Sequence, residues 1–135
     1  MNKHTETLRV ADLEALAAEE YAYLTTRGRR SGQPHEIEIW FALDGTTLYL
    51  LAGAGTASDW VRNLQADSAV TVRLGDATYP AHARVVDPNT DDDERARTLV
   101  HDKFAPRGHG DLIEWRARAL PVALEITTPW LFWRH

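Results

Sequence analysis

The residues best suited to bind a ligand follow the first strand-like segment, in the run Thr25-Thr26-Arg27-Gly28-Arg29-Arg30-Ser31-Gly32. Three of the four positions from 27 to 30 are arginines, and a guanidinium group binds phosphate through two parallel hydrogen bonds. The glycines let the backbone bend around an anion, while Thr26 and Ser31 add hydroxyl donors. The run therefore predicts a compact phosphate site, with a solvated basic hairpin tip as the alternative.

A second candidate for anion binding is the loop Gly53-Ala54-Gly55-Thr56-Ala57-Ser58, which leads into a predicted helix. Free N–H groups at the start of a helix attract anions through their partial positive charge. Thr56 and Asp59 have the spacing of a capping box, which places the first helical turn directly after the loop. Capping without any ligand is the alternative, and no GxGxxG or Walker pattern indicates a nucleotide site.

Tryptophan side chains could form the walls of a site for a flat ring. Trp40 lies on the strand face that it shares with Glu36 and Glu38, and Trp60 falls in the first helical turn after the glycine loop. Tryptophan more often packs in a core or an interface, and that alternative stands for each of them. The C-terminal run Trp-Leu-Phe-Trp, residues 130–133, would be an apolar patch on a monomer. We expect it to be buried against a second subunit.

Acid–base groups are few. Glu36 and Glu38 would project from one strand face about 7 Å apart, but exposure or an arginine partner is a commoner role for such a pair than catalysis. The spacing of His101, His109 and Asp111 matches no metal-binding helix, and the chain has no cysteine. No Gly-x-Ser-x-Gly pattern is present either. We therefore expect neither a metal site nor a nucleophilic hydrolase.

The composition limits the partners. The 135 residues carry 20 acidic and 15 basic side chains, a net charge of −5, so the average field repels nucleic acid and any anion must be bound locally. No apolar run approaches the roughly 20 residues that cross a bilayer, and the N-terminus lacks the apolar stretch of a signal peptide. We expect a soluble, cytoplasmic protein that binds neither nucleic acid nor membrane.

The elements that position the candidate residues follow from hydrophobic periodicity. Residues 1–20 predict a short amphipathic helix that covers a sheet face, and a capping box at Thr90 and Asp93 begins another helix. Turn dipeptides between alternating segments predict hairpins. The expected strands are 21–26, 35–43, 47–52, 69–74, 77–86 and 121–128, and the expected helices are 60–66, 90–103 and a turn around residue 115. About six mostly antiparallel strands with short helices make one α+β domain, residues 1–135, with its sheet closed or half-closed into a barrel.

Two pieces carry a resemblance to a known family: TTRGRRSGQP at 25–34 and DWVRNLQADSAVTV at 59–72. Together with the residues around them, from 23 to 86, they resemble the flavin- and deazaflavin-dependent oxidoreductases of the split β-barrel fold. These are relatives of the pyridoxamine-phosphate oxidases, and the deazaflavin-dependent nitroreductases are the more similar branch. The likeness is weaker as far as residue 126, and residues 1–20 lie outside it.

The resemblance implies a homodimer with its cofactor in a groove at the interface. In the nitroreductase branch that cofactor is coenzyme F420, a deazaflavin with a phosphodiester and an oligoglutamate tail. Arg29 and Arg30 match the family's basic pair on the phosphate, Trp60 a tryptophan that lines the cofactor, and Trp40 an aromatic residue near the substrate. The loop Gly53, Ala54, Gly55, Thr56 and Ser58 matches one along the ring and phosphate, but it is shorter and has no lysine. The strand EIEIWF is similar to the FMN-binding side of the superfamily, so FMN is the alternative cofactor.

The reaction that the resemblance implies is hydride transfer from the reduced ring to an electron-poor acceptor such as an enone, a quinone or a nitro compound. His109 is the hypothetical catalytic proton donor because an unperturbed histidine has a pKa near neutrality; bulk water is the alternative donor. His109 and Leu112 stand where nitroreductases carry tyrosines on the substrate side, so specificity for nitro groups is not implied. A non-catalytic protein that binds a flavin or haem and a non-redox enzyme built on the same barrel remain alternatives.

Overall fold

The computed structural model of the chain describes residues 10–127. Its strands are β1 (Tyr21–Arg27), β2 (Pro34–Trp40), β3 (Ala42–Asp44), β4 (Thr47–Ala52), β5 (Ala69–Leu74), β6 (Ala77–Val85) and β7 (Leu120–Ile126). The helices are α1 (Val10–Leu16), α2 (Asp59–Ala66), α3 (Asp91–Phe104) and α4 (Ile113–Arg118), with short 3₁₀ turns η2 (Gly55–Ala57) and η3 (Ala105–Arg107). The run 130–133, expected in a subunit interface, lies outside the described residues. Within the described part, no helix is long and apolar enough to cross a membrane.

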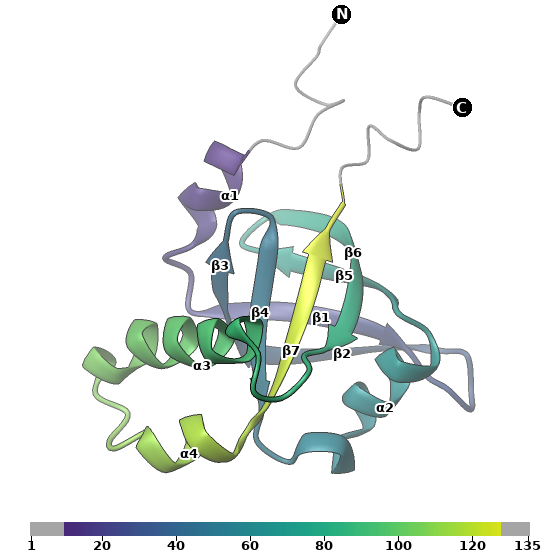
Figure 1. The fold of residues 1–135 in the computed structure, drawn as a ribbon. Helices are drawn as coiled ribbons and strands as arrows, with labels where there is room; N and C mark the ends of the chain where they lie inside the picture. Colours follow the sequence, from purple (N-terminus) through teal and green to yellow (C-terminus); the bar gives the residue numbers. More distant parts are fainter. Residues whose placement is uncertain (1–9, 128–135) are drawn as a thin grey trace, which may run out of the picture.

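The seven strands form one antiparallel sheet in the order β2-β1-β5-β6-β7-β4-β3. The sheet curls, so that β3, β4 and β7 cross in front of β1 and β2 in Figure 1. Helix α2 lies at one end of this half-barrel, whereas α3 and α4 lie on the opposite side. The predicted α+β class and half-closed antiparallel barrel are confirmed, with seven strands in place of about six.

The extra strand arises because the predicted strand 35–43 is broken at Phe41. Its first part, β2, pairs only with β1, and its second part, β3, pairs only with β4. The chain therefore leaves one edge of the sheet and enters the opposite edge across a single residue. At the break, the backbone carbonyl of Phe41 accepts a hydrogen bond of 2.9 Å from Lys103 Nζ on α3. The side chain of Phe41 is fully buried, so the apolar alternation continues through the break and conceals it in the sequence.

Strand β4 is buried on both faces, which explains its nearly continuous apolar sequence. Leu48 and Leu50 point into the barrel with Leu24 of β1, while Tyr49 and Leu51 pack under α3. The predicted N-terminal helix is confirmed over residues 10–16, where the fully buried Leu13 joins the barrel core. The sheet thus packs on one apolar layer inside the barrel and on another under α3, and the loops that carry the candidate site join the strands of this sheet.

Candidate functional site

The loop between β1 and β2, residues 28–33, meets the first two turns of α2 and forms a cleft of about 420 Å³, which we call the arginine cleft. Of the predicted site residues, Arg29, Arg30, Ser31 and Trp60 line it. The second candidate in the sequence was the glycine loop 53–58, whereas the fold brings the basic run against α2, the helix that follows this loop. The complete lining is Gly28, Arg29, Arg30, Ser31, His35, Glu36, Ile37, Asp59, Trp60 and Asn63.

Asn63 joins the two sides of the arginine cleft. Its side chain is buried on α2, where Oδ1 accepts hydrogen bonds from the backbone N–H of Arg29 at 3.1 Å and from Arg29 Nη1 at 2.8 Å. Its Nδ2 donates to Thr26 Oγ1 at 3.3 Å. Sequence reasoning missed Asn63. The available signal was an amide between the apolar residues Val61 and Leu64 of a short helix, because a buried amide needs partners.

The two arginines of the cleft differ in their exposure and in the number of their side-chain partners. Arg29 is mostly buried, with 21% of its side chain exposed, and its Nη2 contacts Asp59 Oδ1 at 3.2 Å. Arg30 is exposed, and no hydrogen bond or ion pair joins it to another residue between 10 and 127. Arg29 is therefore positioned by the protein, whereas the guanidinium of Arg30 is available to a ligand.

A side chain at Gly28 would force its neighbours in this loop to shift. A Cβ there would lie 2.7 Å from both His35 Nε2 and Ser31 Oγ. Ser31 Oγ also accepts a hydrogen bond from the backbone N–H of Gln33 at 3.1 Å, which leaves its own proton free to be donated. Thr26 is only 1% exposed, so its hydroxyl supports Asn63 from beneath the cleft.

The glycine loop, residues 53–58, differs from the prediction in the residue that caps α2. Thr56 does not cap α2, because it lies within η2, and the N-cap residue is Ser58, whose side chain makes no capping hydrogen bond. None of the residues from Gly53 to Ser58 lines the arginine cleft. A Cβ at Gly53 would lie 3.7 Å from the indole nitrogen of Trp115, so this end of the loop faces α4. Its contact with a cofactor stays a prediction.

Trp40 and His109 lie together in a second region, the aromatic cluster, formed by Trp40, Phe104, His109 and Trp115. The Trp40 ring stacks on Phe104 at 4.4 Å with an interplanar angle of 5°. His109 contacts Trp40 at 4.4 Å, and Trp115 meets Trp40 edge-on at 5.6 Å. His109 is exposed, and neither it nor Trp40 lines the arginine cleft. The predicted substrate-side residues thus share one place, distinct from the predicted phosphate site.

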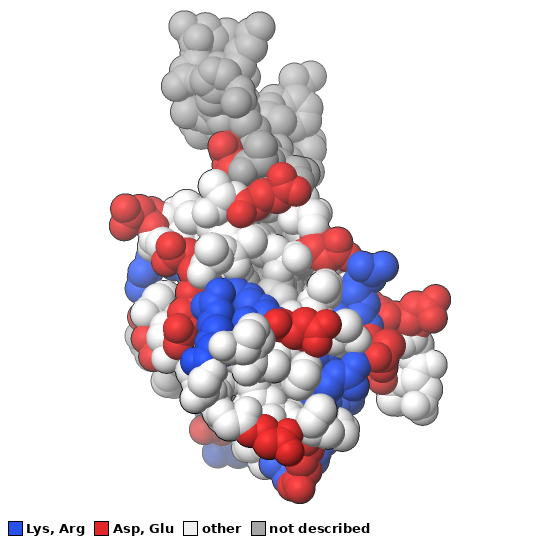
Figure 2. Space-filling view, turned by 90° about the vertical axis from the view of Figure 1, so that its left-hand side faces the viewer, with Lys and Arg blue, Asp and Glu red and all other residues white. Residues whose placement is uncertain are grey.

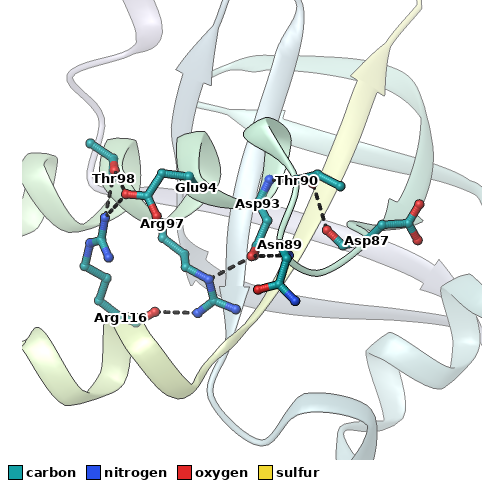
Figure 3. A network of polar contacts seen from close by, with 8 residues as sticks. All are labelled: Asp87, Asn89, Thr90, Asp93, Glu94, Arg97, Thr98 and Arg116. Carbon is teal, nitrogen blue, oxygen red and sulfur yellow. Dashed lines mark hydrogen bonds and ion pairs between the residues drawn. The ribbon is translucent and has the colours of Figure 1, made fainter.

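A polar network fixes α4, and with it Trp115, against α3 (Figure 3). Arg97 donates to Asp93 at 2.9 Å and to the backbone carbonyl of Arg116 at 2.5 Å. Arg116 in turn donates to Glu94 at 2.6 Å, and this hydrogen bond lowers the pKa of the Glu94 carboxyl. The predicted cap of α3 is confirmed, since Thr90 Oγ1 accepts from the backbone N–H of Asp93. The acidic run that begins α3 therefore also binds arginines.

The charged groups outside the cleft are dispersed. On the face of the molecule in Figure 2, basic and acidic side chains alternate in small groups among uncharged residues. Glu38 accepts a hydrogen bond from Tyr23 at 2.7 Å, which raises the pKa of that tyrosine and gives the carboxylate a partner other than the expected arginine. Within residues 10–127 no group of three or more His, Asp or Glu side chains could bind a metal.

Comparison with known proteins gives a family for this arrangement. The model of the F420H(2)-dependent quinone reductases matches residues 3–127. An F420H(2)-dependent quinone reductase of Mycobacterium tuberculosis is 28% identical over 104 residues, which cover 75% of this chain and 69% of that protein. The resemblance noted in the sequence is confirmed, with the quinone reductases as the family that matches.

Solved structures give the fold. A Listeria innocua protein named for pyridoxamine 5′-phosphate oxidase has a TM-score of 0.63 at 14% identity, covering 87% of this chain and 92% of its own. The half-barrel is therefore the split β-barrel of that class. Another structure, described as a domain-swapped dimer, has a TM-score of 0.63 at 21% identity and covers 80% of each chain. A protein of similar fold thus forms a dimer.

Proposed function

The chain belongs to the F420H(2)-dependent quinone reductase family, and we propose that it uses reduced coenzyme F420 to transfer hydride to a quinone or a similar electron-poor acceptor, an enone or a nitro compound. The observation that carries this proposal is the Arg30 guanidinium, which no residue between 10 and 127 pairs with, beside the fixed Arg29 in a cleft that Trp60 also lines. An anionic cofactor gives these arginines a use in a protein whose net charge is −5.

The donor set of the arginine cleft fits a phosphodiester. Arg30 and Ser31 can donate hydrogen bonds to phosphate oxygens, and Arg29 adds a positioned positive charge. Gly28 lines the cleft and carries no side chain, so the loop backbone can approach a ligand closely there. Trp60 presents a flat apolar surface that suits a ring system. When bound, the reduced coenzyme supplies the hydride, and the protein contributes orientation and exclusion of water.

A quinone that accepts a hydride needs one proton to become a hydroquinone. His109 is the side chain that we propose for this role, because it is exposed, lies on the Trp40 ring and belongs to a residue type that titrates near neutral pH. Bulk water is the alternative donor. The aromatic cluster would then provide a flat surface for the acceptor, next to the Gly53 end of the glycine loop.

We also propose that the working form is a homodimer. The split-barrel structure described as a dimer supports this proposal. Size-exclusion chromatography with light scattering tests it, with twice the mass of 15.2 kDa per chain as the expected result. A monomeric mass at micromolar concentration would contradict it.

The decisive experiment titrates the purified protein separately with F420 and with FMN and follows ligand fluorescence. Tighter binding of F420 is expected. Reduced F420 is then mixed with a quinone, an enone and a nitroarene, and recovery of the oxidised coenzyme's absorbance is measured, with the quinone expected to react fastest. Tighter binding of FMN would favour the alternative cofactor. Binding of F420 without oxidation by any acceptor would favour a binding protein without turnover.

A further inference from the structure

The arginine cleft contains a carboxylate that competes for its own cation. Asp59, the first residue of α2, contacts Arg29 at 3.2 Å, and 84% of its side chain is exposed within the cleft. Two arginines and two carboxylates, those of Glu36 and Asp59, line this cleft. An anion that enters the cleft therefore meets the negative carboxylate of Asp59, which already contacts the Arg29 guanidinium that would bind the anion.

Arg29 does not need Asp59 in order to be positioned. Asn63 already fixes it through two hydrogen bonds, one to its backbone and one to its guanidinium. Because the Asp59 side chain is so exposed, its ion pair with Arg29 is of the kind that adds little stability. The Asp59 carboxylate can therefore separate from Arg29 with little loss of folding free energy. Its negative charge nevertheless remains close to any ligand in the cleft.

We propose that Asp59 is a specificity-determining residue that favours a phosphodiester over a phosphomonoester. This inference rests on the proposed function. A phosphodiester carries one negative charge, whereas a phosphomonoester carries between one and two at neutral pH. Repulsion by Asp59 grows with the charge of the phosphate group that lies beside it, so it disfavours the monoester of FMN more than the diester of F420.

The test compares the parent chain with Asp59→Asn in titrations with F420, FMN and riboflavin at low ionic strength. The substitution should tighten FMN binding by up to about five-fold, the upper range for an exposed charge pair. F420 binding should tighten by about two-fold or less, and that of riboflavin, which has no phosphate, should not change. Added salt should reduce both shifts because it screens exposed charges.

Asp76→Asn is the matched control. It removes the same charge from an exposed turn between β5 and β6 and should change no affinity. If Asp59→Asn lowers the melting temperature, Asp59→Gln, which has a higher helix propensity than Asn, gives the same comparison. Equal shifts for FMN and F420, or none, would overturn the inference while the proposed function stands. Failure of F420 to bind either the parent chain or the variant would overturn the proposed function and the inference with it.

Discussion

The arginine cleft and the aromatic cluster lie at two ends of β2 and are built by opposite means. The cleft consists of a charged loop joined to α2 by the buried amide of Asn63 and by the ion pair of Arg29 with Asp59, and Arg30 has no partner among residues 10–127. The aromatic cluster consists of rings packed around Trp40, which stacks on the fully buried Phe104, and hydrogen bonds between α3 and α4 support it. The comparison teaches that stability and ligand binding reside largely in different regions, so substitutions should separate them.

The largest expected effect is on stability. Phe104→Ala removes a fully buried ring that stacks on Trp40, and we expect the free energy of unfolding to fall by about 3–5 kcal/mol. The folded fraction should retain its affinity for F420. Urea denaturation and coenzyme titration at low temperature measure the two quantities. Phe104→Leu, which removes less volume, is the control and should lose less stability. A drop in affinity equal to that of a cleft variant would show that the two regions are coupled.

Asn63→Ala should reduce both stability and binding. It removes three hydrogen bonds and leaves the buried Thr26 hydroxyl without its partner, so we expect a loss of about 2–3 kcal/mol in unfolding free energy. Affinity for F420 should fall about ten-fold because Arg29 loses its position. Thr26→Val keeps both hydrogen bonds from Arg29 to Asn63 and removes only the one between Asn63 and Thr26. If this variant bound as weakly as Asn63→Ala, the role of Asn63 in positioning Arg29 would be wrong.

Arg30→Ala should affect binding alone. We expect affinity for F420 to fall about ten-fold, since a charged hydrogen-bond partner contributes about 1.5–3 kcal/mol. The free energy of unfolding should change by no more than about 0.5 kcal/mol, as for other surface substitutions. Arg118→Ala removes another exposed arginine, one paired with Glu114 on α4, and serves as the control. Unchanged affinity in Arg30→Ala would remove this residue from the site.

The remaining expected effect is a pH dependence that belongs to the fold. Burial lowers the pKa of Lys103 from 10.5 to about 8. Between these values the unfolded chain binds more protons than the folded chain, so the contribution of Lys103 to stability rises with pH across this window and is constant below it. Lys103→Met removes the titration. The unfolding free energy of the parent minus that of the variant should therefore increase from pH 8 to pH 10.5. A constant difference would contradict the lowered pKa.

Local features of the fold could be predicted from the sequence. The turn dipeptides at 44–45 and 75–76 and the alternating segments beside them gave the hairpins, and Thr90 with Asp93 gave the cap of α3. The capping box at Thr56 was wrong because Ser58, two residues later, is an equally suitable cap and lies closer to the apolar residues of α2. Local chemistry cannot choose between two such candidates.

The parts of the site that could not be predicted depend on contacts distant in the sequence. The arginines were visible as a group, but the amide that positions one of them comes from residue 63, which is 34 residues later. At the break in the strand, the carbonyl of Phe41 is bound by Lys103, 62 residues away. The residue types in the sequence indicated the chemistry of the cleft. Which side chains come into contact depends on the curled sheet, which brings together segments that are distant in the sequence.

The position of β7 has a consequence for how the protein folds during synthesis. This strand lies between β6 and β4, and it pairs Glu125 with Thr47, 78 residues earlier. Contacts of such long range slow folding because the loop between them must be ordered first. Until the ribosome releases residues 120–126, β4 and β6 expose unpaired edges that can bind other nascent chains. The half-barrel is thus completed only after the last of its seven described strands has been synthesised.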